Sequence, residues 1–195
     1  MLDPITLPER EDADAKAWFY LDHRQDIEIW AALRDDAAQL LNRYLVDLAP
    51  TFEKLAVEID AEPEFSDELE SGQWPTLGLR RATWHHHGVA DLSVVLEWER
   101  PRLLKPGRNT WPFVAVRLPR SQEDPQRRRQ VTEAVAPVHA QLKGGRKEIV
   151  WPYYRYVLPP TGAPALDPAA YLTGLVASFR ELWDVAAPAL DALHR

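Results

Sequence analysis

Residues 74–118 read WPTLGLRRATWHHHGVADLSVVLEWERPRLLKPGRNTWPFVAVRL, and the alternation within this stretch decides the fold. Every second residue at its centre is apolar, namely Leu92, Val94, Leu96 and Trp98. A period of two places this set on one face of a β-strand. Apolar runs at residues 77–79 and 113–118 flank it. We therefore expect three neighbouring strands in a meander, with turns near residues 87–88 and within residues 100–109.

The segments on either side predict helices and two further strands. Apolar residues at spacings of three and four indicate amphipathic helices over residues 22–48 and 121–143, and a third that begins at Asp167. Alternating side chains at residues 54–60 and an aromatic run at residues 149–158 indicate the two remaining strands.

These elements follow in the order α-β-β-β-β-α-β-α, without a βαβ repeat, which predicts an α+β fold. We expect a single domain with a five-stranded, mainly antiparallel sheet covered by amphipathic helices. Residues 1–20 are acidic, contain two prolines and are expected to form an arm, and residues 21–195 form the domain. Because helices must cover the sheet, Trp98 is expected to share its core with four helical residues. These are Trp30, Leu33, Phe179 and Trp183.

Composition excludes several classes of protein. The chain has 0 cysteines, which excludes disulfides, thiolate zinc sites and cysteine nucleophiles. No run approaches the roughly 18 apolar residues of a membrane span. The first residues lack the basic start and apolar centre of a signal peptide. We expect a cytoplasmic protein without a membrane partner, and no motif calls for a cofactor.

Charge is distributed unevenly along the chain, although the total is only −7. Residues 1–72 carry a net charge of −13, residues 73–160 a net charge of +8, and residues 161–195 a net charge of −2. An acidic segment joined to a basic body is typical either of a surface for a charged partner or of internal charge pairing.

The first functional hypothesis is a non-enzymatic binding protein whose acidic N-terminal third engages a basic protein. Helix 22–48 and the loop at residues 60–70 would supply the carboxylates. The expected partner-binding residues are Asp26, Glu28, Asp35, Asp36, Glu64, Asp67 and Glu68. Inhibitors of basic proteins and mimics of nucleic acid present acidic surfaces of this kind, which is an analogy only.

The alternative is a nucleic-acid-binding protein that uses the arginines and aromatics of residues 80–129. Arginine binds phosphate through its planar fork, and exposed aromatic rings stack on bases. The candidate contacts are Arg102, Lys105, Arg108, Arg127, Arg128 and Arg129. A pI near 5.4 opposes general affinity for nucleic acid. These cations can equally pair with the acidic first 72 residues.

A second alternative is a metal-dependent enzyme at the triple histidine. His85 and His87 share one side of an extended strand and can hold a metal with Asp91 or Glu99 as a third ligand. Glu97 and Glu99 also share a face, but the lysine of a restriction-type nuclease core is absent, so cross-strand ion pairs are the simpler role. The sequence has no nucleophile elbow or phosphate-binding loop, so no enzyme is required.

Overall fold

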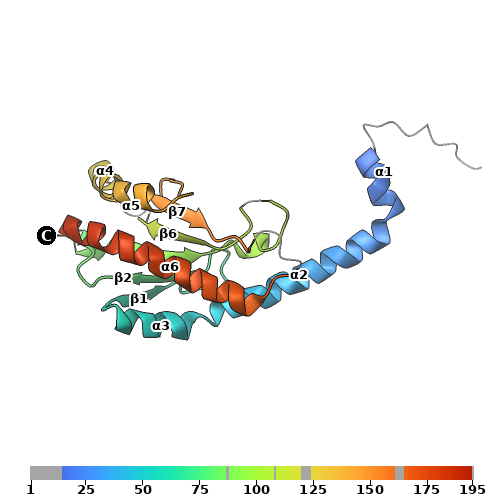
Figure 1. Ribbon diagram of the computed structural model, residues 1–195, viewed down its shortest axis with the longest axis horizontal. Coiled ribbons are helices and arrows are strands. Elements are labelled where there is room, and N and C mark those ends of the chain that lie inside the picture. The colour runs from blue at the N-terminus through green and yellow to red at the C-terminus, as the bar shows by residue number, and fades with distance from the viewer. Residues whose placement is uncertain (1–14, 87, 108, 120–123, 161–164, 195) are drawn as a thin grey trace, which may run out of the picture. The chain divides into compact units, whose positions relative to one another are not determined.

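The computed structural model describes residues 15–86, 88–107, 109–119, 124–160 and 165–194 (Figure 1). The chain divides into two compact units, Met1–Ala37 and Ala38–Arg195. The first unit contains helix α1 (Ala15–Asp22) and the first part of helix α2 (Arg24–Val46). Residues 15–20 of the predicted arm are therefore helical, and residues 1–14 lie outside the described part.

Five strands of the second unit form one sheet, and each strand is antiparallel to its neighbours. In spatial order they are β1 (Glu62–Phe65), β2 (Thr76–Arg80), β5 (Ser93–Glu97), β6 (Phe113–Arg117) and β7 (Tyr153–Tyr156). This arrangement confirms the α+β fold class and the predicted meander. The central strand β5 is buried along its whole length.

A small hairpin interrupts the meander between β2 and β5. It consists of β3 (His85–His86) and β4 (Val89–Ala90), which pair only with each other among the described strands. Gly88 has a φ of 78°, a left-handed conformation that suits glycine in a tight turn. The turn predicted near residues 87–88 therefore closes this hairpin and does not join two strands of the main sheet. His87 itself lies outside the described residues.

The helices of the second unit pack on one face of the sheet. Helix α6 (Pro168–Asp191) crosses β5 and β6, and helix α3 (Ala49–Glu58) covers β1 and β2 (Figure 1). Helices α4 (Pro125–Ala134) and α5 (Ala136–Gln141) complete the layer. Two short 3-10 turns, η2 (Arg100–Arg102) and η3 (Ala192–His194), follow β5 and α6 in the chain. Asp167 caps α6 by accepting hydrogen bonds from the amides of Ala169 and Ala170.

The core lies between this helical layer and the sheet. Trp98 is fully buried and packs in the same cluster as Leu96, Phe179 and Trp183, as expected. Its indole Nε1 donates a hydrogen bond of 2.9 Å to the side-chain oxygen of Asn42. The larger apolar side chains on this face of β2, β5 and β6 are Leu77, Leu79, Val94, Leu96, Val114 and Val116.

Two expectations about the core are wrong. Trp30 is 71% exposed and Leu33 is 55% exposed, so neither belongs to the core around Trp98. Residues 54–60 do not form a strand, because they belong mostly to α3, where Phe52, Leu55 and Ala56 are buried at helical spacing and Val57 is 85% exposed. The first strand is instead β1, within the acidic stretch that was predicted to be a loop.

Candidate functional site

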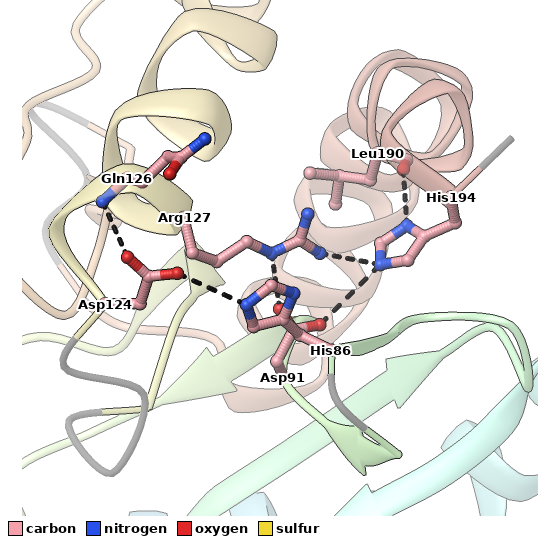
Figure 2. Close-up of polar contacts among 7 residues, drawn as sticks. All are labelled: His86, Asp91, Asp124, Gln126, Arg127, Leu190 and His194. Carbon is pink, nitrogen blue, oxygen red and sulfur yellow. Dashed lines mark hydrogen bonds and ion pairs between the residues drawn. The ribbon is translucent and has the colours of Figure 1, made fainter.

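A cluster of buried polar side chains lies where the β3–β4 hairpin, α4 and the C-terminal turn η3 meet (Figure 2). Asp91 follows β4 directly and is 0% exposed, and Arg127 in the first turn of α4 is 3% exposed. The Nε of Arg127 donates a hydrogen bond of 2.7 Å to Oδ2 of Asp91. This pair removes both charges from water, which stabilises a fold only when the geometry is good and further hydrogen bonds are made.

His194 supplies one of those further contacts. Its Nε2 lies 2.7 Å from Nη2 of Arg127, and its Nδ1 lies 2.9 Å from the carbonyl oxygen of Leu190. A guanidinium only donates and a carbonyl only accepts. Nε2 of His194 therefore accepts from Arg127, and Nδ1 donates to the carbonyl oxygen of Leu190. Such a histidine orients Arg127 and fastens the C-terminal turn to α4.

The triple histidine of the sequence reaches the edge of the same cluster. Nε2 of His86 lies 3.4 Å from Oδ2 of Asp124, the carboxylate that also caps α4 through the amide of Gln126. His85 is exposed on the other side of β3. In the described part of the chain, no group of three or more histidine, aspartate or glutamate side chains is close enough to hold a metal ion. His87 lies outside that part.

The three carboxylates considered for catalysis do not converge. Asp91 belongs to the polar cluster, whereas Oε2 of Glu97 accepts a hydrogen bond of 3.3 Å from the indole of Trp151. Glu99 forms an ion pair of 3.1 Å with Arg102. The arrangement therefore lacks the paired carboxylates that hold magnesium in a nuclease.

The predicted nucleic-acid contacts are divided between two ends of the sheet. Arg102 and Lys105 are exposed in and after η2, at the end where β5 leads into β6. The three arginines of α4 lie at the other end, beyond the last residue of β6. Arg127 is buried against Asp91 and is withdrawn from any phosphate, Arg128 is partly buried, and Arg129 is exposed. Arg108 lies outside the described residues.

The predicted acidic contacts also differ in their surroundings. Asp26, Glu28, Asp35 and Asp36 are exposed on α2, where Glu28 accepts a hydrogen bond from the Tyr20 hydroxyl and Asp35 pairs with Arg34. Asp67 and Glu68 are exposed after β1, but Glu64 pairs with Arg117 at 3.8 Å and accepts a hydrogen bond from Ser93. Further acids of this stretch pair with Arg80 and Arg81, so part of the charge asymmetry is matched internally.

An exposed apolar surface on α1 and α2 accompanies those acids, and sequence reasoning assigned part of it to the core. Its members are Phe19 (61% exposed), Leu21 (58%), Ile29 (51%), Trp30 (71%) and Leu33 (55%). We call this set the N-terminal apolar surface. The helical periodicity of the sequence identifies it, but periodicity does not say what covers the apolar side.

No helix in the described part of the chain combines the length and apolar character needed to cross a membrane. Comparison of the chain with models of protein families, with curated proteins and with solved structures yields no match.

Proposed function

We propose that the protein is a non-enzymatic binding protein, and that its N-terminal apolar surface docks a basic amphipathic helix of a partner protein. The exposure of Trp30 and its apolar neighbours carries this proposal. Soluble proteins seldom leave several large apolar side chains together in water unless the surface binds something. Tryptophan is also the residue type most enriched at the energetic centres of interfaces.

The spacing on α2 suits a helical partner. Trp30, Leu33 and Ala37 follow one another at intervals of three and four residues, the pattern of a helix that packs along another helix. Asp26 lies one turn before Trp30, and Asp36 lies one turn from Leu33, so both carboxylates border the apolar stripe. A partner helix with lysine or arginine beside its own apolar stripe would complement this edge.

Charge favours such a partner over a second copy of the chain. Residues 1–37 hold 10 acidic and 4 basic side chains, a net charge of −6. In a homodimer, two such negatively charged segments would repel each other. A basic partner is instead attracted, and its association is accelerated at low salt.

A defined peptide tests the proposal. The probe is a fluorescent amphipathic peptide of leucine and lysine with leucine at the a and d positions, and the control peptide carries glutamate in place of lysine. We expect anisotropy titrations to show binding of the lysine peptide only, with an affinity that falls as salt rises. Binding of both peptides alike, or of neither, contradicts the proposal.

Matched variants locate the surface. The double variant Trp30→Ala with Leu33→Ala should lower the affinity for the lysine peptide by about tenfold or more. Asp26→Asn with Asp36→Asn should reduce the salt dependence, whereas Asp35→Asn, on the opposite side of α2, should leave it unchanged. Equal effects at positions 35 and 36 would contradict the assigned face. A dimer in light scattering that Trp30→Ala dissociates would assign the surface to a second copy instead.

A further inference from the structure

The face of the sheet that the helices do not cover has a character of its own. Val95, Phe113, Ala115 and Tyr154 form a second apolar cluster there, separate from the main core. Aromatic rings from three segments gather around it. They are Trp74, Phe113, Trp151, Tyr154 and Tyr156, which we call the aromatic face.

The rings of this face contact one another at the distances and angles of specific aromatic packing. The ring centroids of Phe113 and Trp151 lie 5.2 Å apart, and the two planes are nearly perpendicular at 83°. Trp74 lies 6.2 Å from Trp151, and Tyr154 lies 6.0 Å from it. Trp151 is thus central to the group. Trp74 is 41% exposed, so the group has an accessible edge.

A buried carboxylate lies in the floor of the aromatic face. Glu97 is opposite Phe113 in the register of β5 and β6, is 4% exposed, and accepts the hydrogen bond from Trp151. A second carboxylate, Glu148, accepts a hydrogen bond of 2.9 Å from the hydroxyl of Tyr154. Burial raises the pKa of Glu97 to about 7, because the charge of Arg117 and the Trp151 hydrogen bond only partly offset the loss of water.

We propose that the aromatic face binds a small organic cation of the quaternary-ammonium class, held against the ring of Trp151 above the carboxylate of Glu97. Aromatic rings attract cations through the negative potential of their faces, and this attraction grows when water is removed. Quaternary ammonium groups fit because they bring positive charge without hydrogen-bond donors that would need partners.

The carboxylates on this face support that ligand over an extended polyanion. Phosphates would meet the carboxylates of Glu97 and Glu148, although Arg146 also lies near Tyr154 and adds positive charge. The other half of the same sheet face is occupied by side-chain ion pairs, Arg80 with Glu62 and Arg117 with Glu64. These pairs occupy the positions beside the ring cluster on the same face.

Titration of the nitrogen-15-labelled protein with choline tests the proposal. The indole N–H resonances of Trp74 and Trp151 are assigned with the variants Trp74→Phe and Trp151→Phe. We expect saturable shifts of both resonances with choline and with tetramethylammonium. The uncharged isostere dimethylbutanol, in which carbon replaces the nitrogen, should bind about tenfold more weakly, because it keeps the shape and loses the cation.

Variants separate this site from the N-terminal apolar surface. Glu97→Gln should lower the affinity for choline by about the same tenfold factor and leave the affinity for dimethylbutanol unchanged. Trp30→Ala should change neither the affinity for choline nor that for dimethylbutanol. This proposal and the proposed function can therefore fail independently. A dispersed indole spectrum of the unliganded Glu97→Gln protein verifies its fold. Equal binding of choline and its isostere, no binding of either, or no effect of Glu97→Gln overturns the inference. A trimethyllysine peptide that binds more than tenfold tighter than choline assigns the face to a protein ligand and overturns the small-molecule assignment.

Discussion

The Nε of Arg127 lies 2.7 Å from Oδ2 of Asp91, and both side chains are almost completely buried. Arg127 also donates to Nε2 of His194, so one guanidinium connects the β3–β4 hairpin, α4 and the C-terminal turn. A buried pair of this kind differs from the exposed ion pairs of the molecule, because the loss of one partner strands the other charge away from water.

Removal of one member of the pair should therefore be severe. Arg127→Ala is expected to lower the free energy of unfolding by about 3–5 kcal/mol, measured by urea denaturation, because Asp91 is left buried and unpaired. Arg129→Ala, exposed on the same helix, should change it by less than about 0.5 kcal/mol. The double variant Arg127→Met with Asp91→Leu should recover much of the lost free energy of unfolding. Similar losses for Arg127→Ala, Arg129→Ala and the double variant would contradict a paired role.

The two tryptophans that sequence reasoning placed in one core should respond differently to truncation. Trp98→Ala is expected to cost about 3–5 kcal/mol of unfolding free energy, because it opens a cavity and removes one of the two donors, Trp98 and Arg100, to the side-chain oxygen of Asn42. Trp30→Ala, at an exposed position, should change stability by less than about 0.5 kcal/mol. A large loss of thermal stability for Trp30→Ala would contradict its exposed position.

Much of the fold could be predicted because periodicity reports directly on buried faces. The alternation around Trp98 identified β5, and alternation also identified the strands on either side of it. Apolar residues at spacings of three and four identified α6. Residues 54–60 misled because Leu55, Val57 and Ile59 alternate by coincidence, while the helical spacing of Phe52, Leu55 and Ala56 carries the burial. A short segment can satisfy both periods.

The candidate sites were less predictable, because their residues are distant in sequence. Arg127 lies 36 residues from Asp91 and 67 residues from His194, and no spacing rule connects them. The stripe containing Trp30 was visible as a periodic pattern, but the pattern does not identify the surface that covers it. The hydrogen bond between Trp151 and Glu97 depends on the register of the strands and on the path of the chain before β7, and neither can be read from local spacing.

Two glycines offer a test of local packing. A Cβ added to Gly145 would clash with the ring of Tyr153, with two ring carbons at 2.9 Å and a third closer still, and this side chain is fully buried. Gly145→Ala should therefore destabilise the protein by about 1–3 kcal/mol. A Cβ at Gly174, within α6, meets nothing within 4 Å, so Gly174→Ala should stabilise the protein by about 0.5–1 kcal/mol. Thermal denaturation of both variants measures these changes. Shifts of the same sign in the midpoint temperature of the two variants would contradict the packing around Tyr153.

The buried carboxyl of Glu97 should make stability depend on pH. Burial raises its pKa from an ordinary value of 4.5 to about 7, so between these values the native state keeps a proton that the unfolded chain has lost. Rising pH therefore favours the unfolded state throughout this window. The contribution of the protonated group is fully present below pH 4.5 and is lost as the pH rises through about 7.

Other titrating groups act on the same curve, so the comparison must be made against a variant that cannot ionise at this position. Glu97→Gln keeps the size and hydrogen-bonding capacity of the neutral acid. The stability of the natural protein minus that of Glu97→Gln should fall by about 3 kcal/mol as the pH rises from about 4 to 8. Urea unfolding at closely spaced pH values measures this difference. A difference that stays level across the window, or rises with pH, would show that Arg117 and the Trp151 hydrogen bond compensate the charge of Glu97 in full.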